Sequence, residues 1–206
     1  MSNNINDFFY KVNDALLNLD KPSDFFIENL DNEVFDIYPF SVIKELDKVE
    51  QSPIHHKEGN VFKHTMLTID MGAKVRDKSL DKQAFMWGLF LHDIGKISTT
   101  KIRKGKITSY KHDIVGEKMV REFLETFGFL DEDFILRVSK IVRWHMQVMF
   151  VSNGRKDLYN LNQMVEEVNI NEIALVCYCD RMGRVDVDEN SIKKKIDFFI
   201  EKASKI

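Results

Sequence analysis

The chain has 206 residues, of which 44% are hydrophobic and 31% are charged, so it can bury the core of a globular domain and stay soluble. Its 30 basic and 33 acidic residues nearly balance, which argues against the strongly cationic surface typical of nucleic-acid-binding proteins. No run of about 18 apolar residues occurs, and no basic segment followed by an apolar one opens the chain. We therefore expect a cytoplasmic protein.

Few prolines and glycines and few alternating apolar segments favour an all-α fold. The first apolar stripe, from Phe8 to Leu19, predicts a helix that ends at Pro22. Ser23 is then a suitable N-cap for a second short helix that runs through Leu30.

Residues 34–49 predict further short helices, broken at Pro39 because proline lacks the amide that a helix needs. We expect residues 1–50 to form an N-terminal helical annex packed on the main domain. The polar segment 53–59, PIHHKEG, reads as a loop. The main domain is expected to cover residues 51–206.

Five longer helices are expected in the main domain, over about residues 61–76, 81–93, 114–127, 132–146 and 171–182. The apolar face or inner end of each of them carries polar side chains. These inward residues are His64, His92, Asp93, His112, His145 and Asp180. Gly95 is expected to stop the second of the helices, and His112 stands at the entrance of the third.

Two connecting segments interrupt these helices. The segment 98–111 is too polar for a core and is centred on Gly105, which predicts a loop or a short hairpin. The segment 151–161 contains Asn153 and Gly154 and predicts another turn.

Burial of a histidine or an aspartate is unfavourable unless the group is hydrogen-bonded, paired or bound to metal. A single core histidine bonded to a carbonyl would be ordinary, but four of the six histidines and two aspartates share this placement. Imidazoles and carboxylates without thiolates suit Mn²⁺, Fe²⁺, Co²⁺, Ni²⁺, Zn²⁺ or Mg²⁺. Such an ion can acidify a bound water and polarise a phosphoryl oxygen.

Three motifs carry a family resemblance: HHKEGNVFKHT, LHDIGKISTT and CDRMG, within about residues 51–188. They resemble the HD superfamily of metal-dependent phosphohydrolases, and most of all the HD domain of bacterial CCA-adding tRNA nucleotidyltransferases. The resemblance implies an HD-domain bundle of five or more core helices with extra N-terminal helices. Only about 50 residues precede the HD region and they predict helices, so we expect no nucleotidyltransferase head and no addition of nucleotides.

The resemblance implies that His64, His92, Asp93 and Asp180 ligate one divalent ion. Superfamily members with two further histidines, here His112 and His145, can hold a second ion, with Asp93 as the bridging ligand. His112 has the alternative of facing the substrate, so the resemblance leaves one or two ions open.

Asp93 and Lys96 are the expected catalytic residues. Lys96 resembles a family position that contacts substrate phosphate, although a solvated lysine at a helix end is the alternative. Arg181, next to the last expected ligand, is a weaker candidate for substrate binding, and Thr99 and Thr100 are weaker still.

Other polar features have simpler interpretations. A basic run in segment 98–111 could guide phosphates but is typical of a solvated loop: Lys101, Arg103, Lys104 and Lys106. His55 and His56 are not expected to ligate metal. Cys177 is expected to pack in the core rather than form a soft-metal site with Cys179.

Two further details depart from the CCA-adding family. Asp186 and Asp188 form an Asp-x-Asp, but without an upstream Gly-Ser in a strand pattern they predict an acidic loop. Lys111 precedes His112 where that family commonly has a glycine-led step.

The function expected is hydrolysis of a phosphomonoester or phosphodiester of a nucleotide or RNA end, including a 2′,3′-cyclic phosphate. One alternative is a non-catalytic, metal-containing module that binds nucleotide or RNA. Another is a detached partner of a separately encoded tRNA nucleotidyltransferase. The expected partners are thus a phosphoester substrate or an RNA end, and no membrane.

Overall fold

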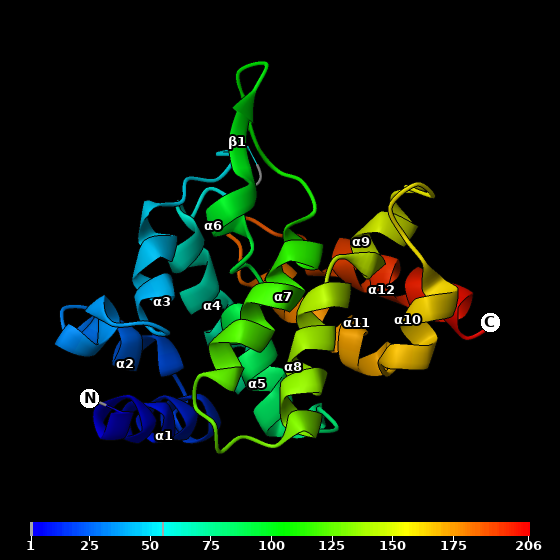
Figure 1. Cartoon of the computed structure of the whole chain (residues 1–206). Coiled ribbons are helices and arrows are strands. Elements are labelled where there is room, and N and C mark those ends of the chain that lie inside the picture. Colours follow the sequence, from blue (N-terminus) through cyan, green and yellow to red (C-terminus); the bar gives the residue numbers. More distant parts are fainter. Residues whose placement is uncertain (1, 55) are drawn as a thin grey trace.

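The structure is a computed structural model that describes residues 2–54 and 56–206. Regular structure in these residues is helical apart from one two-stranded antiparallel sheet (Figure 1). The expected all-α class is therefore confirmed. None of the helices among the described residues has both the length and the apolar character that a membrane crossing needs.

The described N-terminal part consists of one long helix, α1, and four shorter ones, of which η1 and η2 are 3₁₀ helices. They are α1 (Ser2–Asn18), α2 (Pro22–Asn29), η1 (Glu33–Asp36), α3 (Ser41–Glu45) and η2 (Leu46–Lys48). The aromatic ring of Phe9 in α1 stacks on Trp87 with centroids 4.7 Å apart, and Phe26 in α2 stacks on Phe90 at 4.4 Å. These contacts join the N-terminal helices to the core of the main helices.

The main helices follow in chain order. They are α4 (Val61–Ala73), η3 (Arg76–Lys78), α5 (Lys82–Leu91), α6 (Lys96–Thr99), α7 (His112–Glu125), α8 (Glu132–Trp144), α9 (Gln147–Ser152), α10 (Leu161–Glu167), α11 (Ile170–Met182) and α12 (Glu189–Ala203). A large core lies around α4, α5, α7 and α8, and a smaller one around Trp144 lies under α9 to α12. The helices α1 and α2 lie at one end of the molecule and α10 and α12 at the other (Figure 1).

The start of α2 differs from the expected one. Pro22 occupies the first turn, where its missing amide is harmless, and Ser23 is buried inside the helix rather than capping it. The amide and Oγ of Ser23 donate to the Asp70 carboxylate at 2.9 and 2.7 Å, which ties α2 to α4. Leu19, expected on the apolar stripe, lies beyond the end of α1 and is 41% exposed.

The expected role of Gly95 as a helix stop is wrong. Helix α5 ends at Leu91, and Gly95 has helical angles (φ −64°, ψ −14°) as the N-cap residue directly before α6. A Cβ on Gly95 would lie 2.1 Å from the His112 carbonyl oxygen and 2.7 Å from the Gly116 amide. Gly95 is therefore required by the close approach of α6 to the start of α7.

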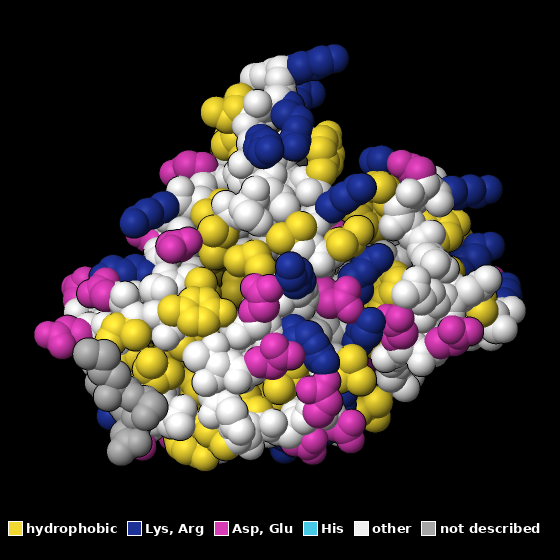
Figure 2. All heavy atoms as spheres, in the orientation of Figure 1, with side chains coloured by type: hydrophobic (Ala, Val, Ile, Leu, Met, Phe, Trp, Pro, Cys, Tyr) yellow, Lys and Arg dark blue, Asp and Glu magenta, His cyan; other side chains and the backbone are white. Residues whose placement is uncertain are grey.

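The segment 98–111 was expected to be a loop or a short hairpin, and most of it forms a hairpin. Strand β1 (Thr100–Arg103) pairs with β2 (Lys106–Ser109), with Ile102 opposite Ile107. Lys104 and Gly105 both have positive φ, of 49° and 73°, as a two-residue hairpin turn requires. The hairpin projects from the helical body (Figure 1), and dark-blue basic side chains gather on it (Figure 2).

Candidate metal centre

Two helices of the centre end in a histidine. His92 directly follows α5 and His145 directly follows α8, where helix ends leave backbone carbonyls without partners. The Nδ1 atom of His92 lies 2.7 Å from the Leu89 carbonyl oxygen, and that of His145 lies 2.6 Å from the Val142 oxygen. Each imidazole thus caps its own helix.

His112 is held in the same way at the start of α7, with its Nδ1 2.8 Å from the Ser109 carbonyl oxygen. A carbonyl oxygen only accepts, so Nδ1 carries the proton in all three rings. In the neutral form of each ring, Nε2 then holds a bare lone pair. The backbone therefore fixes His92, His112 and His145 in the tautomer whose Nε2 is ready to ligate a cation.

Two of these nitrogens face each other. His112 Nε2 lies 3.2 Å from His145 Nε2, and Asp93 Oδ1 lies 3.4 and 4.0 Å from the same two atoms. Two bare lone pairs and a carboxylate oxygen repel one another unless a proton or a cation lies among them. One atom from each of Asp93, His112 and His145 falls within 4.8 Å of the others, a spacing that suits a single ion.

A second triad consists of His64, His92 and Asp180, whose ligand atoms meet the same 4.8 Å limit. His64 Nε2 lies 3.0 Å from Asp180 Oδ1, and among the described residues His92 Nε2 has no hydrogen-bond partner. A Cβ on Gly183, at the end of α11, would lie 2.9 Å from the Thr68 Cα in α4. This close packing brings Asp180 from α11 against His64 from α4.

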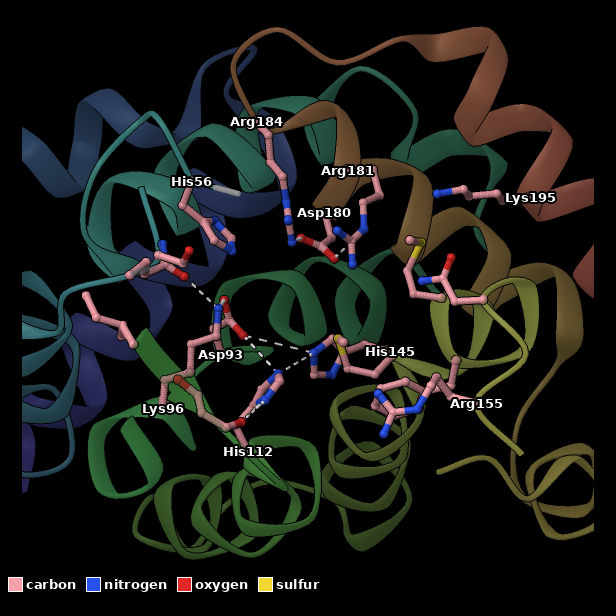
Figure 3. A pocket seen from close by; sticks show the side chains of 18 residues that line it. His56, Asp93, Lys96, His112, His145, Arg155, Asp180, Arg181, Arg184 and Lys195 are labelled. Carbon is pink, nitrogen blue, oxygen red and sulfur yellow. Dashed lines mark hydrogen bonds and ion pairs between the residues drawn. The ribbon is translucent and has the colours of Figure 1, made fainter. Parts of the chain in front are cut away.

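Asp93 belongs to the triad with His112 and His145 and also reaches the other triad. Its Oδ2 is 3.2 Å from His92 Nε2 and 3.9 Å from His64 Nε2, while its Oδ1 faces its own triad. The side chains of Asp93, His112, His145 and Asp180 point toward one another (Figure 3). The structure thus brings together all six of the residues that the sequence singled out as ligands.

The carboxylates of the centre are ionised. Burial would raise the pKa of Asp93, but the neighbouring His92 and Lys96 outweigh it and hold that pKa well below its ordinary value. Burial opposes ionisation of Asp180 as well, and Arg184 and Arg181 hold its pKa well below the ordinary value. Both aspartates are therefore in the form that binds a cation.

Two of the imidazoles are held neutral. Burial lowers the pKa of His112, and burial together with the charges of His112 and His92 lowers the pKa of His145 to about 3. Burial also acts to lower the pKa of His92, but the Asp93 and Asp180 carboxylates outweigh it and the pKa is raised. A cation close to His92 would displace its second proton, as metal binding at histidine generally does.

The donor set fits a borderline or hard divalent ion. The six converging residues offer imidazole nitrogens and carboxylate oxygens and no sulfur. Burial raises the pKa of the Cys177 thiol to about 12 and also raises that of Cys179, so both stay protonated. Cys177 packs in the smaller core, as the sequence predicts, and Cys179 packs in the larger one.

The sequence interpretation missed Glu58. Its buried Oε1 lies 2.7 Å from His56 Nδ1 and 3.0 Å from His64 Nδ1, on the side of His64 away from Asp180. Burial opposes ionisation, but hydrogen bonds from His64, the Glu58 backbone and His56 lower the pKa of Glu58 to about 2. A glutamate between two histidines in HHKEGNVFKH was the available signal.

His56, Glu58 and His64 are also close enough to form a third ligand set. A neutral imidazole has one bare nitrogen, so His64 can ligate an ion on one side only. With Nε2 turned to Asp180, the Nδ1 side is left to carry the proton toward Glu58. His56, which was not expected to ligate metal, is a member of this third set, and His55 lies outside the described residues.

Lys96 is buried beside the centre and is only 8% exposed. Its Nζ donates to Asp93 Oδ2 at 2.7 Å and to Gln51 Oε1 at 2.6 Å. This placement differs from that of a solvated lysine at a helix end. Gln51, a second residue that the sequence interpretation missed, holds the lysine from the loop that precedes α4.

A cavity of about 540 Å³ opens onto the centre. Two carboxylates, of Asp93 and Asp180, line it together with five cationic side chains: Lys96, Arg155, Arg181, Arg184 and Lys195. The excess of cations suits an anionic ligand such as a phosphate. Arg181 was expected here, whereas Arg184 was missed although it lies four residues after Asp180 and donates to its Oδ1 at 3.1 Å.

The other polar residues discussed in the sequence analysis, which were not expected to ligate metal, lie outside the six-residue ligand set. Asp186 and Asp188 lie between α11 and α12, where Asp188 caps α12 by accepting from the Asn190 amide. Thr99 Oγ1 donates to the Gly95 carbonyl, and Thr100 Oγ1 bonds to Ser109 Oγ. The basic side chains of the hairpin are exposed: Lys101, Arg103, Lys104 and Lys106.

Comparison with known proteins identifies the family of the chain. The HD domain family model matches residues 61–184, which is more than half of the chain. The Multifunctional CCA protein of Halorhodospira halophila is 31% identical over 99 residues, which cover 48% of this chain and 22% of that protein. The protein of the same name from Haemophilus influenzae is 25% identical over 170 residues, 77% of this chain and 39% of that protein. The chain thus matches less than half the length of either relative, and by its family match it belongs to the HD domain family.

Proposed function

We propose that this chain is a metal-dependent phosphohydrolase that cleaves a phosphomonoester or phosphodiester of a nucleotide or an RNA end. HD domains are in general metal-dependent hydrolases. The observation that carries the proposal is the facing pair of His112 Nε2 and His145 Nε2, 3.2 Å apart beside Asp93, because this arrangement calls for a cation.

Six residues would hold the metal. His64, His92 and Asp180 form one side of the centre, His112 and His145 form the other, and Asp93 offers one oxygen to each side. A divalent ion bound there supplies acidification of water and polarisation of a phosphoryl oxygen. Because the residues form two ligand sets, the centre could bind one or two ions.

The cationic wall of the cavity would bind and orient the phosphate. Lys96 reaches the centre with a buried ammonium group and holds Asp93 Oδ2, so it fixes that carboxylate and adds positive charge where the reacting phosphate gains negative charge. Arg181 lines the same cavity and presents a planar set of donors suited to phosphate oxygens.

The relatives and the hairpin bear on the substrate class. Two relatives carry the name Multifunctional CCA protein, which favours a nucleotide or the end of an RNA, including a 2′,3′-cyclic phosphate. The β2 residues Ile107 and Ser109 line the cavity, so the basic hairpin stands at its edge. Its exposed cations could attract the phosphates of a nucleic-acid end.

The proposal is tested with metal-free protein that is reloaded with Mn²⁺, Fe²⁺, Co²⁺, Ni²⁺, Zn²⁺ or Mg²⁺ and assayed on nucleoside monophosphates, nucleoside 2′,3′-cyclic phosphates and short RNAs. We expect hydrolysis that His92→Ala and Asp93→Asn abolish while the circular dichroism spectrum stays helical. Asp197→Ala, at an exposed position of α12, is the control that keeps activity. Unchanged turnover in both site variants would overturn the proposal, and nucleotide binding without turnover would identify a non-catalytic binding module instead.

A further inference from the structure

A second cavity, of about 710 Å³, lies beside the one that opens onto the metal centre. The two cavities share five lining residues: Ser109, His112, Met146, Phe150 and Arg155. A ligand bound at the centre can therefore extend past His112 and Arg155 into the second cavity without leaving the protein surface.

Six of the side chains that line the second cavity are apolar or aromatic: Tyr110, Ile114, Met146, Phe150, Leu158 and Tyr159. Tyr110 at the end of the hairpin is 66% exposed, Ile114 in α7 is 45% exposed and Leu158 is 40% exposed. Tyr159 also lines the cavity, and its ring is half-buried against the smaller core. Exposed apolar groups gathered around a concavity are typical of a ligand site.

The arginines and aspartates in this wall are paired with one another, and Lys111 is an exposed cation at its rim. Arg143 donates to the Asp113 carboxylate at 2.9 Å, and Arg155 donates to Asp157 through two nitrogens at 3.2 and 3.1 Å. The first cavity, in contrast, places four further cations, of Lys96, Arg181, Arg184 and Lys195, against the two carboxylates of Asp93 and Asp180. The second cavity is thus better suited to a neutral, flat group than to a second phosphate.

A nucleotide has the matching shape, because one sugar separates its charged phosphate from a flat, uncharged base whose faces can stack. We infer that the second cavity holds the nucleobase of a substrate whose phosphate lies at the metal centre. This inference rests on the proposed function and gives its substrate a nucleoside portion. The Tyr110 ring supplies a stacking surface, and the Leu158 side chain packs against the base.

Tyr110 is held in place for this role. The guanidinium carbon of Arg103 lies over the ring, 4.9 Å from its centroid, while Arg103 itself donates to Thr108 Oγ1 across the hairpin. A cation over an aromatic face restrains the ring, and the desolvation free energy is small because both groups stay partly in water. The hairpin therefore contributes a positioned aromatic group to the cavity as well as its exposed charges.

The first test measures binding without any hydrolysis. Adenosine and ribose, which both lack a phosphate, are titrated into the metal-loaded protein and followed by the amide resonances of Tyr110 and Leu158. We expect saturable shifts with adenosine and at least about tenfold weaker binding of ribose, the size of effect that one base-aromatic stack gives. The variant Tyr110→Ala/Leu158→Ala should lose this preference.

The matched control is Tyr10→Ala/Leu136→Ala, which removes side chains that are 57% and 43% exposed on α1 and α8. It should keep the preference for adenosine. Equal binding of adenosine and ribose by the unmodified protein, or a preference that survives in the Tyr110 and Leu158 variant, would overturn the inference.

A second test separates this inference from the proposed function. The value of kcat/KM is compared for adenosine 5′-monophosphate and ribose 5-phosphate, which differ only by the base. We expect at least about tenfold higher kcat/KM for the nucleotide, reduced to parity in the Tyr110 and Leu158 variant. Equal hydrolysis of both esters by the unmodified protein would refute the base site and leave the phosphohydrolase standing. Adenosine bound in this cavity by a protein that hydrolyses no phosphoester would refute the phosphohydrolase.

Discussion

The carboxylate of Glu58 lies 3.0 Å from Nδ1 of His64, while Nε2 of the same ring lies 3.0 Å from Asp180 Oδ1. A neutral imidazole has one N–H and cannot serve two carboxylates at once. Glu58 is ionised, because hydrogen bonds from His64, the backbone and His56 overcome its burial and lower its pKa to about 2. The charge of Glu58 draws the proton to Nδ1 and leaves Nε2 bare for a cation.

Glu58→Gln should weaken metal binding because it removes the charge that sets the tautomer of His64. Loss of such a supporting carboxylate typically lowers metal affinity about 10–100-fold. Competition with a chelating dye measures the affinity, and Glu28→Gln, at an exposed position of α2, is the control. Equal metal affinities of Glu58→Gln and the unmodified protein would show that Glu58 does not orient the ring.

The sequence predicted the inward histidines and aspartates well because helical periodicity reports directly on burial. His64 and Asp180 share apolar stripes with their neighbours, and both are buried as that pattern requires. Their mutual contact, over 116 residues of separation, followed only from the family resemblance. Helical periodicity predicts which face of a helix is buried, but it does not predict which other helix packs against that face.

Glu58, Gln51 and Arg184 were missed for a related reason. All three lie outside the helices and strands, where no period distinguishes a buried polar group from a solvated one. Gly95 was misassigned because a glycine after a helix has two explanations, a positive φ or a close approach. Only the distance of 2.1 Å from its ideal Cβ to the His112 carbonyl oxygen decides between them.

Lys96→Met should lower kcat/KM for a phosphoester by about 10²–10³-fold, as loss of one donor to a transition-state oxygen does. Metal affinity should not fall, because Asp93 loses a competing cation at Oδ2. Metal titration and steady-state kinetics of the same preparation separate the two effects. Lys194→Met, at an exposed position of α12, is the control. Activity within a few-fold of the unmodified protein would remove Lys96 from the reaction.

Gly95→Ala should destabilise the protein by about 1–3 kcal/mol, the usual effect of forcing atoms into a packed site. The added methyl would meet the backbone of α7 at His112, which cannot give way without moving that ligand. Gly116→Ala is the matched comparison, since its methyl would be tight only against a Val142 side-chain carbon at 3.0 Å and would lie at an ordinary 3.5 Å from the Gly95 amide nitrogen. Urea unfolding should show the larger loss for Gly95→Ala, and the opposite order would contradict the close-approach explanation.

Glu172→Gln should stabilise the protein more at pH 8 than at pH 4. Burial raises the pKa of Glu172 above its ordinary value, so the folded state holds the proton more tightly than the unfolded state does. Folding stability from this group is therefore fully present below the unfolded pKa and is lost as the pH rises through the folded pKa. Glutamine stays neutral, so the loss should be absent in the variant.

Urea unfolding of both proteins at the two pH values measures this difference. Glu166→Gln, at an exposed position of α10, is the control for a charge change without burial. A difference in unfolding free energy between Glu172→Gln and the unmodified protein that is the same at pH 4 and pH 8 would contradict a raised pKa.

The metal centre can be tested by diffraction from crystals soaked in MnCl₂, recorded with the anomalous signal of manganese. We expect an anomalous peak within coordinating distance of His64, His92 and Asp180, of Asp93, His112 and His145, or of both triads. Loss of the peak beside His112 and His145 in His145→Ala crystals would confirm which side chains bind that ion. Fully soaked crystals with no peak within coordinating distance of either triad would contradict a metal centre at these residues.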